Sequence, residues 1–143
     1  MNARVALAET REQVARCFEV IHELRPHLVD AESFVAQVLR QQAQGYQLAF
    51  VEADDEVRAA AGFRVTECLW LGKFLYVDDL VTRHDDRSRG FGKQLIDWLA
   101  EHGRVAGCAE LHLDSGVQRF DAHRFYLTQR MHIVAHHFAL KLL

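Results

Sequence analysis

RSRGFGK, at residues 87–93 of this 143-residue sequence, is a basic loop, and the residues on either side of it indicate the type of fold. Residues 74–82 before it are rich in aromatic and β-branched side chains, which predict a strand. After it, mostly apolar residues recur every three or four positions and predict a helix with one face on a sheet. That face consists of Leu95, Trp98, Leu99, His102 and Val105 or Ala106. The chain therefore runs from a strand through a basic, glycine-containing loop into a helix.

The glycines and basic residues of this loop predict an anion site at the start of the helix. Gly90 and Gly92 let the backbone approach a ligand closely, so that amide N–H groups of the first helical turn can point at an anion. The helix dipole adds to the attraction, and Arg87, Arg89 and Lys93 supply positive charge. The loop lacks the pattern of a P-loop and the third glycine of a dinucleotide-binding fingerprint. We expect phosphate groups to bind here, with a merely solvated basic surface as the alternative.

The rest of the sequence predicts further strands and two more helices. Thr10 and Gln13 have the spacing of a capping box for a helix that ends near residue 24. A second helix follows Asp30 and is closed by Gly45. The other predicted strands are residues 5–8, 46–52, 57–69, 109–114 and one or two within 131–142. Antiparallel strands thus lead up to the loop, and the helix after it returns the chain to a strand parallel to residues 74–82.

Composition predicts a single domain over residues 1–143. Half of the residues are hydrophobic, which is enough for one core in a chain of this length. A net charge of −3 argues against a nucleic-acid partner, and no apolar run is long enough to span a membrane. The first residues do not form a basic and apolar leader, so we expect a cytoplasmic protein.

Neither the cysteines nor the histidines predict a metal site. Cys17, Cys68 and Cys108 are far apart, lack CxxC spacing and are expected to be free thiols. His136 and His137 are neighbours in a predicted strand, so their side chains would point to opposite faces. We expect no bound metal.

Two motifs have the order and separation of a known family. DLVT at residues 79–82 is followed after four residues by RSRGFG at 87–92, and AHRFY stands further on at 122–126. The first pair resembles the acetyl-CoA motif of the GNAT superfamily of N-acetyltransferases, and AHRFY is similar to that family's AxxFY segment. The resemblance spans residues 46–143. It implies an α/β (α+β) fold of the GNAT type: a mixed, mostly antiparallel twisted sheet with a parallel splayed strand pair, flanked by about four helices.

The resemblance also implies acetyl-CoA as co-substrate. The pantetheine arm would lie between the splayed strands and bond to backbone groups of the first of them, and the basic loop would hold the pyrophosphate. The implied cofactor-binding residues are Leu80, Val81, Thr82, Arg87, Ser88, Arg89, Gly90, Phe91, Gly92 and Lys93.

Two residues are candidates for acid–base chemistry. Asp78 and Asp79 are adjacent carboxylates in an otherwise apolar strand, where an unpaired charge is costly to bury. Regular alternation would point them to opposite faces unless a bulge re-aims them. The resemblance implies Asp78 as general base, since the spermidine/spermine acetyltransferases carry an acidic residue there; Asp79 is the reserve, and a structural pair at a strand end is the alternative. Tyr126 resembles the tyrosine that protonates the leaving thiolate of coenzyme A, with a core tyrosine as its alternative.

The predicted function is direct transfer of the acetyl group of acetyl-CoA to a primary amine of a small molecule or protein. A non-catalytic acyl-CoA-binding or regulatory module is the alternative, and a phosphate site without CoA specificity is a third interpretation. Arg119 stands where many relatives have asparagine, and Arg119 or His123 would then hold the cofactor instead. His22, Arg25 and His27 are candidates for the acceptor wall, with two helices that only pack on the sheet as the alternative. The acceptor itself stays open, and the apolar C-terminal strand would offer a contact for a homodimer.

Overall fold

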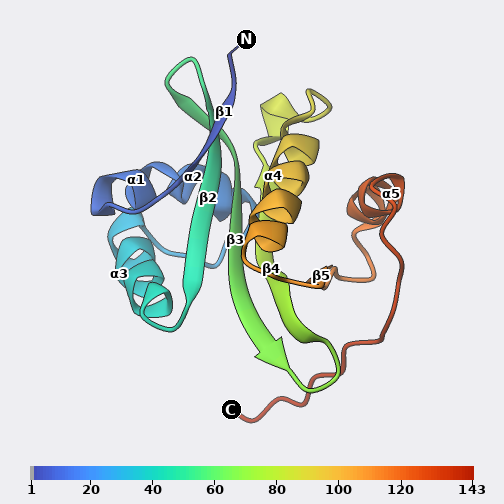
Figure 1. The fold of residues 1–143 in the computed structure, drawn as a ribbon. Coiled ribbons are helices and arrows are strands. Elements are labelled where there is room, and N and C mark those ends of the chain that lie inside the picture. Colours follow the sequence, from blue (N-terminus) through green and yellow to red (C-terminus); the bar gives the residue numbers. More distant parts are fainter. Residues whose placement is uncertain (1) are drawn as a thin grey trace. The chain divides into compact units, whose positions relative to one another are not determined.

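The structure, a computed structural model, describes residues 2–143 and contains one five-stranded sheet with helices (Figure 1). The elements in chain order are β1 (Arg4–Leu7), α1 (Arg11–Arg16), α2 (Phe18–Leu24), α3 (Ala31–Gln42), β2 (Tyr46–Ala53), β3 (Glu56–Cys68), β4 (Gly72–Thr82), the 3-10 helix η1 (His84–Asp86), α4 (Phe91–Val105), β5 (Glu110–Leu113) and α5 (Phe120–Thr128). The chain divides into two compact units, Met1–His112 and Leu113–Leu143. The single domain predicted from the sequence therefore stays a prediction.

The sheet has the mixed topology that the sequence predicts. Its strand order is β1-β2-β3-β4-β5, with antiparallel pairing from β1 to β4 and a parallel β4–β5 pair. Asp54 and Asp55 join β2 to β3 with φ angles of 53° and 61°. Two successive residues in the left-handed region form the type of two-residue turn that matches the twist of a hairpin. The predicted hairpin is therefore confirmed.

The caps of the N-terminal helices are also confirmed. Thr10 accepts a hydrogen bond from the Gln13 amide at 3.1 Å, and the Gln13 side chain accepts one from the Thr10 amide at 3.0 Å. Asp30 caps α3 by accepting from the Ser33 amide at 2.7 Å. The first predicted helix is divided in two, because the Cys17 amide donates to the Val14 carbonyl only three residues back.

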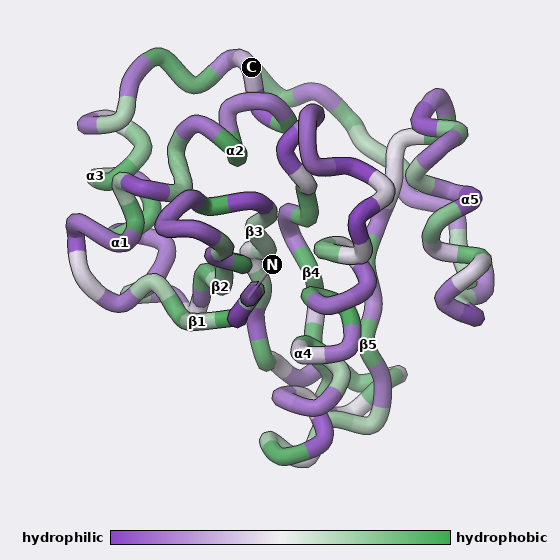
Figure 2. The backbone as a smooth tube through the Cα atoms, turned by 90° about the horizontal axis from the view of Figure 1, so that it is seen from above, coloured by the Kyte–Doolittle hydropathy of each residue, from purple (hydrophilic) through white to green (hydrophobic). Residues whose placement is uncertain are grey.

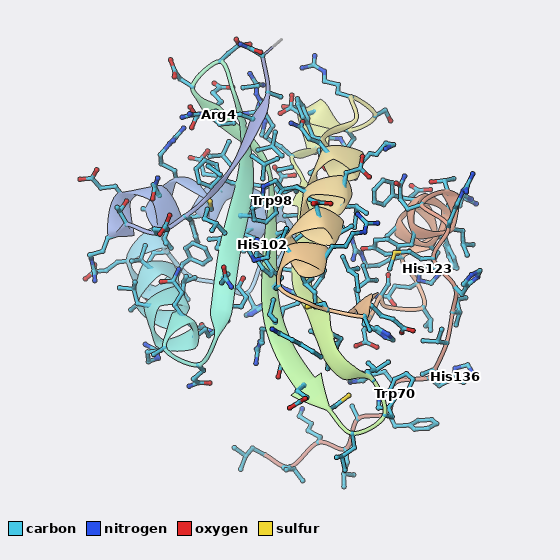
Figure 3. The ribbon with its side chains drawn as sticks, viewed as in Figure 1. Arg4, Trp70, Trp98, His102, His123 and His136 are labelled. Carbon is cyan, nitrogen blue, oxygen red and sulfur yellow. The ribbon has the colours of Figure 1, made fainter. Side chains whose placement is uncertain are left out.

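Each face of the sheet is covered by different helices (Figure 1). On one face, α1, α2 and α3 share a core with β2 and β3 that includes Val14, Phe34, Leu48, Phe50 and Ala60. On the other face lies α4, whose Leu95 and Leu99 are fully buried. Trp98 and His102 stack on each other along α4 (Figure 3), and both rings contact Phe63 of β3. The residues of α4 thus form a second core on this face of the sheet, and β5 follows α4 along the chain.

One prediction about apolar residues is decided between its alternatives, and one is wrong. Of Val105 and Ala106, Ala106 is partly buried, whereas Val105 is 81% exposed, because 3.6 residues per turn place Val105 roughly 80° around the helix from Leu95. The strands predicted within residues 131–142 do not form, and this segment contains neither helix nor strand. A strand requires a neighbour for its backbone groups, and no other strand of residues 2–143 pairs with this segment. Figure 2 shows hydrophobic residues along it, of which Ile133, Val134, Phe138, Leu140, Leu142 and Leu143 are exposed.

No helix among residues 2–143 combines the length and the apolar character needed to cross a membrane.

Candidate functional site

The centre of β4 contains a β-bulge at Asp78. Gly62 of β3 lies opposite Asp79, while the next residue, Phe63, lies opposite Val77, so Asp78 is one residue too many on its strand. A bulge of this kind shifts the alternation of side chains. Before it, Val77 lies across from Phe63 on the α4 side; after it, Val81 belongs to the core that α1, α2 and α3 cover.

The bulge puts both neighbouring carboxylates on the face that α2 covers. Asp79 accepts hydrogen bonds from Arg25 Nε at 3.0 Å and from the Tyr46 hydroxyl at 2.8 Å. Asp78 accepts one from Arg64 Nε at 3.0 Å. Tyr46 and Arg64 are partners across β2 and β3, so they stand on one face of the sheet. Of the two predicted arrangements, opposite faces or a bulge, the structure has the bulge.

The pKa values of Asp78 and Tyr46 are both raised. Partial burial raises the pKa of Asp78, and the charge of Arg64 opposes this only in part. Burial and the nearby Asp79 carboxylate raise the pKa of Tyr46 well above its ordinary value. Tyr46 therefore stays a hydroxyl donor to Asp79, while Asp78 holds a proton more readily than an ordinary aspartate.

Gly62 makes room for this arrangement. A Cβ atom at this position would lie 1.7 Å from the Tyr46 hydroxyl oxygen, far inside van der Waals contact. Any side chain at position 62 would displace the Tyr46 ring. Because the Tyr46 hydroxyl donates to Asp79, Gly62 helps to position that carboxylate indirectly, through Tyr46.

The basic loop leaves the first turn of α4 open. Gly90 is the N-cap with a φ of 86°, and it has no side chain that could accept from the helix. The first helical hydrogen bond runs from the Gln94 amide to the Gly90 carbonyl at 2.9 Å. The amides of Phe91, Gly92 and Lys93 precede it and have no carbonyl within the helix to donate to. This is the geometry that binds anions at helix N-termini.

The basic side chains of the loop are not equally available. Arg89 Nη1 donates to Asp86 Oδ1 at 3.1 Å, and Lys93 Nζ donates to Asp97 Oδ2 at 2.6 Å. Among residues 2–143, no carboxylate pairs with the side chain of Arg87, which is exposed. The loop thus offers one uncommitted guanidinium beside the open helix end.

The sequence did not single out Asp86, which accepts hydrogen bonds from arginines in this loop and beside it. The Asp86 side chain is almost fully buried and accepts hydrogen bonds from Arg58, Arg83 and Arg89. Burial favours the neutral acid, but the hydrogen bonds and charges of Arg83 and Arg58 outweigh it and lower the pKa of Asp86. A signal was present in Arg58, a charged residue within the alanine-rich apolar run of β3.

The second unit carries the tyrosine of the AxxFY segment. Tyr126 lies in α5, and burial raises its pKa, against the opposing charge and hydrogen bond of Arg119. A raised pKa keeps the phenol protonated at neutral pH. Nε2 of His123 lies 2.7 Å from the Gly116 carbonyl oxygen, which engages that nitrogen. No group of three metal-ligating side chains occurs within residues 2–143.

Comparisons with known proteins bear on the family of the chain. The model of the acetyltransferase (GNAT) family matches residues 7–131. YhdJ of Bacillus subtilis (strain 168), described as an uncharacterized N-acetyltransferase, is 35% identical over 118 residues, or 82% of each chain. The aminoalkylphosphonate N-acetyltransferase of Salmonella typhimurium is 34% identical over 67 residues, 47% of this chain and 42% of that protein.

A solved structure supports the fold. The structure of AAC(6')-Iy in complex with the bisubstrate analog CoA-S-monomethyl-acetylneamine has a TM-score of 0.87 at 14% identity, over 100% of this chain and 99% of that chain. The match extends over both compact units. On the family model and the relative from Bacillus subtilis, the chain belongs to the acetyltransferase (GNAT) family and is an acetyl-CoA-dependent acyltransferase.

Proposed function

We propose that the protein transfers the acetyl group of acetyl-CoA directly to a primary amine. In this proposal the Arg87–Lys93 loop holds the pyrophosphate, and the backbone of Leu80, Val81 and Thr82 holds the pantetheine. Asp78 takes the proton of the attacking amine, and Tyr126 protonates the departing thiolate. The amine attacks the thioester in a ternary complex, so no covalent enzyme intermediate forms.

The open first turn of α4 is the observation that carries the cofactor assignment. A helix end with a glycine N-cap and free amides attracts phosphate oxygens through hydrogen bonds and the helix dipole. The free guanidinium of Arg87 adds a charge-assisted donor. Ser88 and Gly90, both at positive φ, keep the loop backbone close to the helix end.

The bulge supports Asp78 as general base. An amine attacks a thioester only after losing its proton, and a carboxylate with a raised pKa is a better proton acceptor than an ordinary one. Asp79 is less suited to this role, because Arg25 and the Tyr46 hydroxyl already occupy its two oxygens. Asp78 has one oxygen bonded to Arg64 and one that is not bonded in the described part of the chain.

A small molecule is the acceptor we favour over a protein. The relative from Salmonella typhimurium is named for an aminoalkylphosphonate, an amine that also carries an anion. Here Arg25 and Arg64 use Nε for the aspartates, and their side chains remain about 40% exposed. Arg25 Nη2 also donates to the Asp78 carbonyl at 3.0 Å. The remaining outer N–H groups of the two arginines would suit an anionic group on the acceptor.

Calorimetric titration with acetyl-CoA, with dephospho-CoA and ATP as comparison ligands, tests the cofactor. Micromolar binding of acetyl-CoA that is lost in Gly90→Glu is the expected result. Gly45→Glu is the matched control, because Gly45 also has a positive φ and open space at its Cβ position but lies outside the loop. Absence of acetyl-CoA binding by the folded wild type would overturn the proposal.

A panel of amines then tests the acceptor, with release of free thiol as the readout. We expect turnover with 2-aminoethylphosphonate to exceed turnover with spermidine and with a peptide that has a free N-terminus. Turnover confined to the peptide would reject the small-molecule assignment while leaving acetyl transfer in place.

A further inference from the structure

Asp86 joins the basic loop to the sheet. It ends the short 3-10 helix η1 and is 1% exposed. Arg58 reaches it from β3, with Nη1 at 3.2 and 3.4 Å from the two carboxylate oxygens. Arg83 Nε donates to it at 2.6 Å and Arg89 Nη1 at 3.1 Å. One buried carboxylate thus connects β3, the residue that follows β4 and the loop before α4.

Asp86 pairs with three arginines rather than with one. A buried charge is tolerated only when its hydrogen bonds are satisfied, and here each oxygen of Asp86 accepts from two guanidiniums. Arg58 is itself buried and gives its Nε to the Ala53 carbonyl at 3.1 Å, so the strand end of the network is fixed. Arg89 is half exposed, so its other N–H groups face solvent.

We propose that Asp86 is a positioning residue for the cofactor's pyrophosphate: it holds Arg89 and fixes the loop to β3, so that Arg89 and the first amides of α4 face one anion. This inference rests on the proposed cofactor site. Asp86 itself is a carboxylate and repels phosphate, so it acts through Arg89 and the loop backbone. Glu56, which bonds to Arg58 and Arg83 but not to Arg89, does not take part.

Binding of two thioesters separates positioning from general structural support. Acetyl-CoA carries the pyrophosphate, whereas S-acetylpantetheine carries the same thioester and arm without any phosphate. In Asp86→Asn the dissociation constant of acetyl-CoA is expected to rise about tenfold, the value of one charge-assisted hydrogen bond. That of S-acetylpantetheine is expected to stay unchanged. Asp86→Glu, which restores the charge, should recover part of the affinity for acetyl-CoA.

Two further variants keep the test decisive. Glu56→Gln removes a carboxylate from the same arginines and should leave acetyl-CoA binding unchanged. In an Arg89→Met background, the further effect of Asp86→Asn should shrink, because the two residues act as a unit. This comparison uses acetyl-CoA alone, so it holds even when S-acetylpantetheine binds too weakly to measure.

Three results would overturn the inference. They are unchanged acetyl-CoA binding in a folded Asp86→Asn, an equal loss for both thioesters, and an undiminished effect of Asp86→Asn in the Arg89→Met background. Should Asp86→Asn not fold, the same measurements on Asp86→Glu decide, with a smaller rise expected for acetyl-CoA alone. Wild-type protein that does not bind acetyl-CoA would instead remove the proposed cofactor site, a result distinct from these three.

Discussion

Asp78 and Asp86 lie eight positions apart and have opposite electrostatic surroundings. Asp86 is buried among three guanidiniums, and its pKa is lowered. Asp78 is partly buried beside one bonded guanidinium, that of Arg64, and its pKa is raised. Burial acts on both carboxylates in the same direction, so the number and placement of the arginines decide the sign.

These surroundings suit the two carboxylates to different roles. A carboxylate whose oxygens are all occupied is a fixed point for other side chains and gives up its proton readily. A carboxylate with a free oxygen and a raised pKa can take a proton and release it again. Burial and the number of bonded arginines therefore distinguish Asp86, a structural carboxylate, from Asp78, the candidate base.

The largest expected effect is on turnover in Asp78→Asn. Removing a general base should lower kcat by about 10²–10⁴-fold while acetyl-CoA binding stays unchanged. In the wild type, kcat/KM should fall as the pH is lowered through the pKa of Asp78, which lies above the ordinary 3.8. Steady-state kinetics on the best amine of the panel measure both.

Asp79→Asn is the matched control for that variant. It removes the neighbouring charge but should cost much less turnover, because the Asp79 oxygens are occupied by Arg25 and Tyr46. Equal losses in the two variants would mean that neither carboxylate acts as the base, and that the bulge matters only for structure.

The second expected effect is on stability, in Asp86→Ala compared with Asp78→Ala. Removing the buried acceptor takes a hydrogen-bond partner from three arginines, of which Arg58 is buried, and should cost about 3–5 kcal/mol. The partly exposed Asp78 pair should change the free energy of unfolding by about 1 kcal/mol or less. Urea unfolding of both variants measures the two losses in free energy of unfolding. Similar losses would contradict the assignment of Asp86, but not Asp78, as a structural carboxylate.

The smallest expected effect is in the pH dependence of stability. The lowered pKa of Asp86 means that its stabilising contribution is present above the ordinary 3.8 and is lost as the pH falls through its folded-state pKa. The raised pKa of Asp78 has the opposite sign: the wild type should lose stability relative to Asp78→Asn as the pH rises from 3.8 through the folded-state value. Unfolding of wild type and Asp78→Asn across this range measures the second term, and a difference that does not vary with pH would contradict it.

Local chemistry explains which elements could be predicted. The capping box of Thr10 and Gln13, the Asp54–Asp55 turn and the glycine at the start of α4 each depend on residues within a few positions. The motif from Asp79 to Gly92 predicted the family for the same reason. Structure that depends only on neighbouring residues can therefore be predicted from the local sequence.

Features that depend on distant partners could not be predicted. The bulge at Asp78 is defined by the register against Gly62 and Phe63, and Asp86 receives Arg58 from 28 positions away. The strands predicted within residues 131–142 failed for a related reason: alternating apolar residues favour a strand only when a second strand supplies hydrogen-bond partners. In each case a second segment, absent from the local pattern, determines the result.

The bulge has one more consequence, for the two cores. Because one extra residue reverses the phase of β4, the same strand contributes Leu75 and Val77 to the layer beneath α4, and then Val81 to the layer beneath α1, α2 and α3. The crossover point between these layers is Asp78. The residue proposed as the base therefore stands where the two cores of the sheet meet on one strand.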